Sequence, residues 1–513
     1  MSKLYPVVEK SIAALQADMA AGLVDSEGLV RAYLDRIETI DRSGPTLRSV
    51  IALNPKALDE ARRLDAERRD GKVRGPLHGI PVLVKDNIDT DDGTATTAGS
   101  LALVDNVTLR DAPVVARLKA AGAVILGKTN LSEWANIRST RSVSGWSAVG
   151  GLVRNPYVLD RSASGSSSGT GAAIAASLGA VGVGTETNGS VISPSSVAGL
   201  VGLKPTVGLV SRTHIVPISH CQDTAGPMGR SVEDVAILLT AMAGADPADA
   251  ATAQANDHAR DYAAALGGAS LAGWRLGVLA FATELAAAVD ALFDEAMATL
   301  RGHGAEIVPL GDYKRPSEIS AKARIALMRE FKTDLNAYLA TTPATVKTRT
   351  LADLIAFNRL NAREMALFGQ DYFELAEATK GIEDEAWLEA RQTAVRLAGP
   401  EGIDRLIADH RLDALIAPTA GPASRIDFAT GDHTAGRSSG FPAICGYPHL
   451  TVPMGQVQGL PAGLSFIGPA WSEARLLALG HAYEQAAQAR RPPTYIPSLE
   501  TTPAADLATA PHL

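Results

Sequence analysis

Cysteine is almost absent from this chain of 513 residues, which contains two, Cys221 and Cys445. Two thiols cannot build a disulfide framework or a cysteine-based metal set, so we expect both to be buried and structural. The ten histidines show no spacing that is typical of metal ligands. We therefore expect a protein that needs no metal and no cofactor.

An excess of positive charge is also lacking. The net charge is −8 and the sequence pI is about 5.7. This balance argues against nucleic acid or an anionic membrane as the main partner. The first residues, from Met1 to Pro6, contain no apolar stretch of the kind found in signal peptides. A cytoplasmic protein is therefore expected, and an exported form that has lost its leader is the alternative.

Charge is nearly missing from one long segment, Ser162–Lys204. Between Arg161 and Lys204 the sole formal charge is Glu186, whereas a chain that is 20% charged would place roughly eight charges over that length. The segment is therefore expected to be buried. It is rich in serine and glycine, and buried hydroxyls need partners while glycine lets backbone N–H groups approach a ligand. Such residues suit a serine nucleophile beside an oxyanion-binding backbone.

Three other interpretations of this segment compete with that one. A membrane-spanning helix is disfavoured because serine and glycine are dense and the apolar part, Ala172–Val183, is short. A flexible linker is disfavoured because Ile174, Leu178 and Val181 recur at packing intervals. An ordinary buried helix and strand with incidental serines stays open on this segment alone.

The rest of the chain alternates between helical and apolar extended patterns, which predicts a single α/β domain over residues 1–513. Helices are expected at residues 8–24, 26–41, 57–69, 112–121, 232–243, 286–300 and 472–490. Strands are expected at residues 79–85, 123–126, 201–210, 215–218, 274–279, 412–416 and 450–452. The first of these strands is continuously apolar and delivers Lys85 at its carboxyl end.

Two segments differ from this alternation. Residues 316–398 are more charged and almost wholly helical in pattern, which predicts an added helical layer. This layer could cap a cleft or serve only as a packing scaffold. The proline-rich segment 491–513 is expected to be a loose tail.

Two familiar functional motifs also match the sequence, but the residues around them do not support either function. Gly122–Thr129 fits a phosphate-binding loop literally, but its variable positions are apolar and favour a buried strand. Gly165–Gly169 fits the nucleophile elbow and would nominate Ser167 with some histidine and aspartate. Gly436–Gly440 fits the same string, and no strand pattern precedes the first copy, so we set the elbow aside.

Four motifs together resemble the amidase signature family of serine hydrolases: Gly79–Asn87, Ser164–Gly169, Gly184–Ser190 and Gly202–Thr206. Further segments are similar to the bacterial peptide amidases of that family, namely Leu126–Asn136, Gln222–Met228, Leu351–Asn358, Arg396–Asp404 and Gly446–Met454. The resemblance covers nearly the whole chain. It implies the amidase-signature fold, one large twisted mixed β-sheet with helices on both faces.

The resemblance also implies roles for individual residues. Ser190 would be the nucleophile, Ser166 a bridging serine entered through a cis peptide bond, and Lys85 the base. The backbone amides of the segment Thr187, Asn188, Gly189 and Ser190 would form the oxyanion hole, with Ser167 and Asp223 in support.

The chemistry of these residue types agrees with those roles. A serine hydroxyl needs a neighbouring proton acceptor, and a lysine accepts a proton only when burial keeps it neutral. The apolar run before Lys85 offers such burial.

The sequence departs from the family pattern at three positions. Asn188 and Ser168 stand where glycine is common, although aspartate also occurs at the first. Backbone donors tolerate changes of side chain, so the departures at these two positions are not expected to prevent catalysis. Ile192 stands where many members carry arginine. Without that arginine the pocket is less able to bind an acidic group of a substrate, which favours a neutral or apolar substrate.

The expected activity is removal of ammonia from the C-terminal carboxamide of peptides. Alternatives are a broad amidase or aryl acylamidase acting on small neutral amides, an amidotransferase A subunit, and a non-catalytic binding protein that keeps the fold. A monomer is expected, with a homodimer as the alternative.

Overall fold

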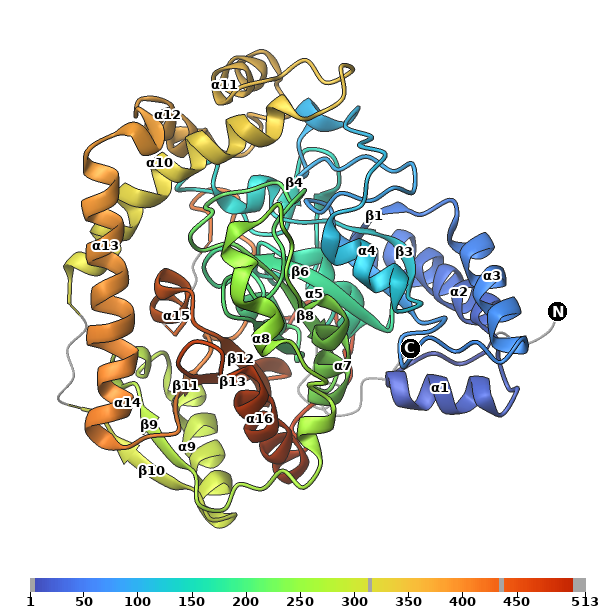
Figure 1. The fold of residues 1–513 in the computed structure, drawn as a ribbon, viewed down its shortest axis with the longest axis vertical. Helices are drawn as coiled ribbons and strands as arrows, with labels where there is room; N and C mark the ends of the chain where they lie inside the picture. The colour runs from blue at the N-terminus through green and yellow to red at the C-terminus, as the bar shows by residue number, and fades with distance from the viewer. Residues whose placement is uncertain (1–4, 312–315, 433–437, 502–513) are drawn as a thin grey trace.

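The computed structural model describes residues 5–311, 316–432 and 438–501. Its centre is an 11-stranded sheet in the order β1-β3-β2-β6-β8-β7-β12-β13-β11-β9-β10 (Figure 1). The strands are β1 (Val50–Leu53), β2 (Pro81–Lys85), β3 (Val124–Thr129), β6 (Val181–Glu186), β7 (Val201–Lys204), β8 (Thr224–Gly229), β9 (Arg275–Val278), β10 (Glu306–Pro309), β11 (Ala414–Pro418), β12 (His449–Val457) and β13 (Leu460–Ile467). A separate hairpin joins β4 (Trp146–Ser147) to β5 (Gly151–Leu152).

The sheet is mixed in direction, as predicted. β2 pairs in parallel with both β3 and β6, and β9 pairs in parallel with β10 and β11. The central strands β6, β8, β7, β12 and β13 pair antiparallel in succession. The prediction of a large mixed α/β sheet is confirmed.

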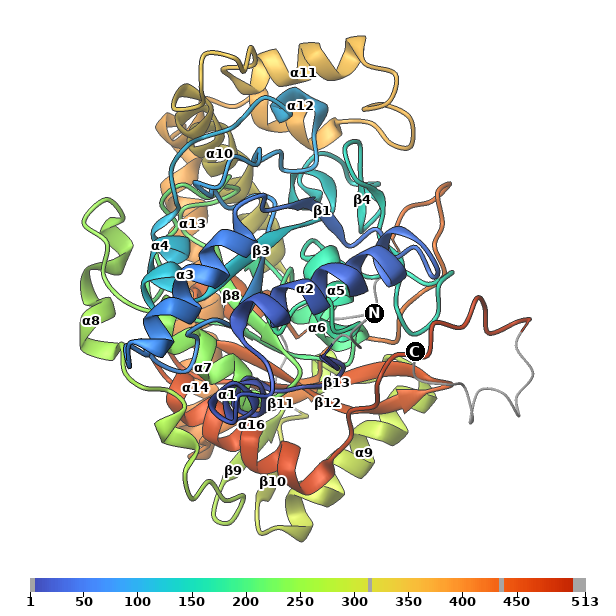
Figure 2. The same ribbon diagram turned by 90° about the vertical axis from the view of Figure 1, so that its right-hand side faces the viewer.

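Helices surround this sheet. They are α1 (Ile12–Ala20), α2 (Ser26–Arg36), α3 (Ala57–Arg69), α4 (Pro113–Ala120), α5 (Ser168–Ala175), α6 (Ile192–Val197), α7 (Val232–Met242), α8 (Ala255–His258), α9 (Ala287–Gly302), α10 (Glu318–Ala340), α11 (Leu351–Leu360), α12 (Asp371–Glu377), α13 (Ala386–Ala398), α14 (Arg405–His410), α15 (Gly440–Cys445) and α16 (Glu473–Ala487). Both α5 and α7 pack on β6 and β8, and they lie on opposite sides of the sheet (Figure 2). The sheet is thus covered on both faces, and most of its strands are buried along their whole length for that reason.

The helices α10 to α13 form a layer at the upper left of Figure 1. Phe331 and Phe373 from this layer pack with Trp134 of the central body, and the rings of Trp134 and Phe373 lie 5.8 Å apart. The layer also reaches two cavities, through Leu327 in one and Asp334 in the other.

Several predicted boundaries need correction. Residues 215–218 are not a strand, because they make a single isolated bridge, from Ile215 to Ile88. The strand predicted at 201–210 ends at Lys204, directly before Pro205, whose missing N–H cannot extend a ladder. The helix predicted at 26–41 is α2, capped by the Asp25 side chain, followed by a π-helical turn at Ile37–Arg42.

The expected loose tail is docked over the part that the structure describes. The amides of Tyr495 and Ile496 donate to the carbonyls of Pro156 and Tyr157, and both side chains are buried. Residues 502–513 lie outside the described residues. Across the described ranges, no helix combines the length and apolar character needed to cross a bilayer.

Candidate active site

Lys85 ends strand β2 inside the molecule, with 0% of its surface exposed. Its Nζ lies 2.7 Å from Ser166 Oγ, 2.9 Å from Thr185 Oγ1 and 3.3 Å from the Thr185 carbonyl oxygen. Burial lowers the pKa of Lys85 to about 7, against the opposing charges of Asp223 and Glu186. The predicted burial of this lysine is confirmed, and at neutral pH a large share of it is uncharged.

The arrangement around Nζ suits the neutral amine. An uncharged lysine has two N–H bonds and one lone pair. The carbonyl and hydroxyl oxygens of Thr185 can accept both hydrogens. The lone pair is then left to face the hydroxyl of Ser166.

Ser166 lies in the loop before α5 and is fully buried. The peptide bond from Gly165 to Ser166 is cis. The carbonyl oxygen of Ser166 accepts from the Ser132 amide at 3.1 Å. A Cβ on Gly165 would lie 2.2 Å from Ser132 Oγ, so this position has room only for glycine.

Ser190 lies in the turn between β6 and α6, at the wall of a cavity. Its carbonyl oxygen accepts from the Ser167 amide at 3.1 Å, which holds this turn against the loop that carries Ser166. Within the described residues, no hydrogen bond joins Ser190 Oγ to Ser166 Oγ. The structure therefore forms the contact between Lys85 and Ser166, and it brings Ser190 to them through the backbone.

The turn before Ser190 is shaped by one buried carboxylate. Glu186 accepts from the amides of Gly189 at 2.7 Å, Val191 at 2.8 Å and Ile192 at 3.0 Å. The Gly189 amide is thus engaged by Glu186, and it is not available as an oxyanion donor in this arrangement. The expected set of four amides is reduced to Thr187, Asn188 and Ser190, whose N–H groups have no hydrogen-bond partner within the described chain.

Gly189 itself is required by the backbone of this turn. Its φ is +84°, a conformation that other residues adopt at a cost. A Cβ there would lie 3.1 Å from Ser193 Oγ and from Ser439 Oγ.

The two supporting residues, Ser167 and Asp223, hydrogen-bond to the segment that leads to Ser190. Ser167 Oγ donates to the Thr185 carbonyl at 3.1 Å and accepts from the Thr185 amide at 3.2 Å. Asp223 accepts from Thr187 Oγ1 at 2.5 Å and from the amides of Ile218 and Ser219 at 2.7 and 2.9 Å. Burial raises the pKa of Asp223 to about 6.

Sequence reasoning gave no role to Thr185, Glu186 or Asn87. Asn87 Nδ2 donates to Thr185 Oγ1 at 3.0 Å and so fixes the hydroxyl that contacts Lys85. Glu186 did carry a signal, because a single charge inside an uncharged segment must find buried partners. Those partners are backbone amides, which sequence patterns do not display.

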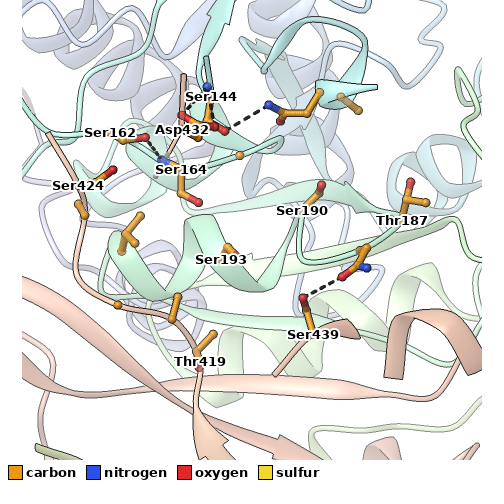
Figure 3. A pocket seen from close by; sticks show the side chains of 18 of the residues that line it. Ser144, Ser162, Ser164, Thr187, Ser190, Ser193, Thr419, Ser424, Asp432 and Ser439 are labelled. Atoms are coloured by element: carbon orange, nitrogen blue, oxygen red, sulfur yellow. Dashed lines mark hydrogen bonds between the residues drawn. The ribbon is translucent and has the colours of Figure 1, made fainter. Parts of the chain in front are cut away.

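The first cavity has a volume of about 360 Å³ and is lined in part by hydroxyl groups (Figure 3). These come from Ser144, Ser162, Ser164, Thr187, Ser190, Ser193, Thr419, Ser424 and Ser439. Ile137, Val197 and Leu327 add apolar surface, and Asp432 adds a carboxylate that accepts from the Ser144 amide. Ile192, expected to tune this pocket, is buried and does not belong to its described lining.

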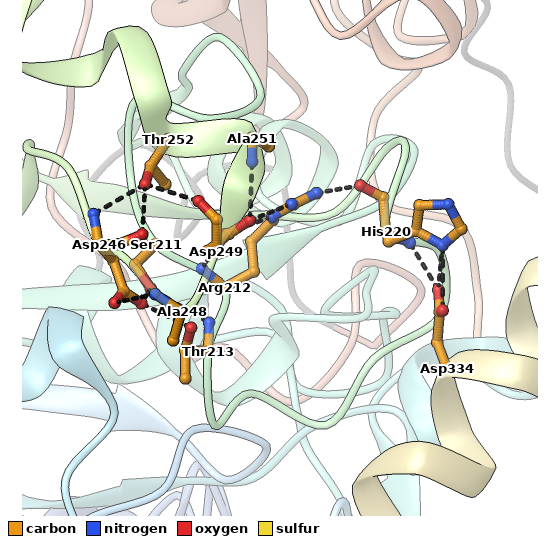
Figure 4. Close-up of polar contacts among 10 residues, drawn as sticks. All are labelled: Ser211, Arg212, Thr213, His220, Asp246, Ala248, Asp249, Ala251, Thr252 and Asp334. Atoms are coloured by element: carbon orange, nitrogen blue, oxygen red, sulfur yellow. Dashed lines mark hydrogen bonds and ion pairs between the residues drawn. The ribbon is translucent and has the colours of Figure 1, made fainter.

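A second cavity of about 480 Å³ shares Ala135, Thr187 and Ile218 with the first. Figure 4 shows two ion pairs in its wall, Arg212 with Asp249 and His220 with Asp334. Asp223 lines this cavity and reaches the first one through Thr187.

No histidine in the described ranges hydrogen-bonds to Ser166, Ser167 or Ser190. His449 is buried, bonds Ser465 Oγ at 2.6 Å, and has its pKa lowered to about 3 by burial. The geometry therefore gives no support to Ser167 with a histidine and an aspartate.

Comparison with known proteins agrees with the fold. The family model "Amidase" matches residues 28–477. The chain belongs to the amidase signature family. It is 40% identical to a probable amidase of Arabidopsis thaliana, over 97% of this chain and 93% of that protein. It is 34% identical to the A subunit of a glutamyl-tRNA(Gln) amidotransferase from Halorhodospira halophila, over 93% of this chain and 97% of that one.

Among solved structures, the native peptide amidase of Stenotrophomonas maltophilia is 51% identical, with a TM-score of 0.90. The alignment covers 96% of this chain and 99% of that chain. Membership of the family and these neighbours identify the protein as an amide hydrolase.

Proposed function

We propose that this amide hydrolase removes ammonia from the C-terminal carboxamide of peptides, with Ser190 as nucleophile, Ser166 as proton relay and Lys85 as base. The observation that carries the proposal is a fully buried Lys85 whose Nζ lies 2.7 Å from Ser166 Oγ. The similarity to the peptide amidase of Stenotrophomonas maltophilia supports the substrate class.

In the first half-reaction, neutral Lys85 accepts the proton of Ser166 while Ser166 accepts the proton of Ser190. The Ser190 oxygen then bonds to the amide carbon, and the carbonyl oxygen becomes an oxyanion. The amides of Thr187, Asn188 and Ser190 face this charge, and each such donor contributes roughly 3–4 kcal/mol to the transition state. When the C–N bond breaks, Ser166 returns a proton to the departing nitrogen, and ammonia leaves.

In the second half-reaction, water attacks the ester carbon formed on Ser190. Lys85 again takes a proton, through Ser166, and the ester bond breaks as the proton returns to Ser190. The products are a free carboxylate and regenerated enzyme, so no external oxidant, reductant or cofactor enters the balance.

A panel of amidated peptides tests the substrate class, with mass spectrometry following the terminal amide and the internal bonds separately. We expect conversion of the terminal amide to the acid, with internal bonds intact. Failure on every amidated peptide, together with turnover of small amides or anilides, would support a broad amidase instead. The modest volume of the first cavity is the observation that favours this second candidate.

The amidotransferase interpretation has its own signature. It requires a stoichiometric partner and glutamine-dependent activity, and it is supported by the 34% identity to the amidotransferase chain of Halorhodospira halophila. Hydrolysis of amidated peptides by the isolated chain, without a partner, would count against it.

A further inference from the structure

One cluster of metal-type ligands lies outside the proposed catalytic residues. His220, Cys221 and Glu330 each offer a ligand atom, and these atoms all lie within 4.8 Å of one another. His220 and Cys221 belong to the loop before β8, whereas Glu330 comes from α10 of the helical layer. No spacing in the sequence could have predicted this set, because the third ligand arrives from a distant helix.

We propose that these three side chains form a binding site for a divalent transition metal of the zinc type. Imidazole, thiolate and carboxylate are the ligands that zinc takes in proteins. A thiolate and a carboxylate together balance the charge of a divalent ion, so the loaded cluster carries no net charge. In a tetrahedral zinc site the ligand atoms lie roughly 3.3–3.8 Å apart. The three ligand atoms would therefore have to approach one another by about 1 Å to bind one ion.

The surroundings already orient two of the ligands. Asp334 lies 2.9 Å from His220 Nδ1, which leaves Nε2 as the nitrogen that can release its proton and bind the metal (Figure 4). Glu330 accepts from Trp387 Nε1 at 2.9 Å and from the Ser219 hydroxyl. A carboxylate behind the histidine and hydrogen bonds behind the ligating carboxylate are the outer contacts that metal sites use.

The site has access to solvent and room for a fourth ligand. His220 lines the second cavity, and its side chain is 39% exposed. Cys221 is partly exposed, unlike a thiol sealed in a core. Three protein ligands and one water from the cavity complete a tetrahedron.

Two arginines contact the backbone of the loop that carries His220 and Cys221. Arg212 is neutralised by Asp249, and its contact with this loop is to the His220 carbonyl oxygen. Arg391 likewise donates to the Cys221 carbonyl oxygen at 2.9 Å. A metal here would tie α10 to the loop 218–223, whose Asp223 holds Thr187.

The test uses the full-length protein, stripped with a chelator and titrated with Co²⁺ without oxygen. We expect thiolate-to-cobalt absorption that saturates at about one ion per chain and is bleached by Zn²⁺. Cys221→Ser should lose the absorption, whereas Cys445→Ser, the matched control, should keep it. Cys445 suits this purpose because its thiol contacts the Phe441 carbonyl oxygen in a different region.

Two further measurements test the proposed metal site even if one of the variants folds poorly. Glu330→Gln should weaken cobalt binding at least tenfold, and Zn²⁺ should raise the Tm of the wild type and of Cys445→Ser but not of Cys221→Ser. Amide hydrolysis by each variant reports that it is folded. Wild-type protein without cobalt absorption, or absorption that survives Cys221→Ser, would overturn the site. Neither outcome bears on the proposed peptide amidase activity.

Discussion

The amine of Lys85 and the hydroxyl of Ser166 lie 2.7 Å apart in a place that water does not reach. The contact joins the end of strand β2 to the loop before α5. It couples the protonation of a buried lysine to a serine that lies beside the cavity.

Activity should depend on the neutral form of Lys85. Because burial lowers its pKa to about 7, kcat/KM for an amide substrate should rise with pH through that value and then level off. Lys85→Ala should lower kcat at least about 100-fold at every pH. Replacing any histidine, such as His449→Ala, should cost less, and an equal loss would revive a histidine base.

The free energy of unfolding should also depend on the protonation of Lys85. The folded pKa of Lys85 lies near 7, below the ordinary lysine value of 10.5, so the unfolded chain binds more protons between these values. The free energy of unfolding should therefore rise with pH across this window, by roughly 1.4 kcal/mol per pH unit from this group. Lys85→Met should lose that increment. Denaturant titrations of both proteins between pH 7 and 10.5 measure it as a difference, and parallel curves would contradict the assigned pKa.

The hydroxyl of Thr187 should act by positioning the turn before Ser190. Its hydrogen bond to Asp223 is 2.5 Å long. Thr187→Val should lower kcat roughly tenfold to a hundredfold with little change in KM. Thr213→Val is the matched control, because Thr213 makes a similar bond to Asp246, which contacts neither Ser166 nor Ser190. Equal losses in the two variants would point to a general effect of a lost threonine–aspartate bond.

Gly165 should tolerate no side chain. An added Cβ would meet Ser132 Oγ at 2.2 Å and Ser144 Oγ at 3.0 Å. Gly165→Ala should displace the loop that carries Ser166 and cost about 1–3 kcal/mol of stability, with a larger loss in kcat. Gly302→Ala is a suitable control, since nothing lies within 4 Å of that Cβ. Full activity in Gly165→Ala would show that the loop has more freedom than this packing allows.

The helical layer should depend on a buried arginine. Arg138 is fully buried, pairs with Glu133 and with Glu364 at 3.1 Å, and lies over the ring of Phe368 at 4.1 Å. Arg138→Met leaves two carboxylates without their cation and should cost about 3–5 kcal/mol. The exposed Arg31, paired with Glu27 on one helix, should tolerate Arg31→Met with little change. Urea unfolding of the two variants compares them.

Much of the fold was accessible from hydrophobic patterning. The continuous apolar run before Lys85 correctly indicated a strand buried on both faces, and the uncharged segment from Ser162 to Lys204 is buried along nearly all its length. Strands β1, β6, β8, β10 and β13 were not among the expected strands. Glycine and proline interrupt β8 and β13, and such residues resemble loops until neighbouring strands cover them.

The site was less accessible, because its contacts join distant segments. The family resemblance nominated Lys85, Ser166 and Ser190, but the partners of Glu186 and Asp223 are backbone amides, which no side-chain pattern reveals. The second cavity arises where residues 212–223 meet α10, and only the folded chain brings them together.

The most direct test of the account is the rate at which a fluorophosphonate labels Ser190, followed by mass spectrometry of the modified peptide. Wild-type protein should be labelled at Ser190, at a rate that rises with pH through about 7. Ser190→Ala should take no label, and Lys85→Ala should react at least about 100-fold more slowly, without this pH dependence. Labelling at another serine, or equal rates in wild type and Lys85→Ala, would contradict the account.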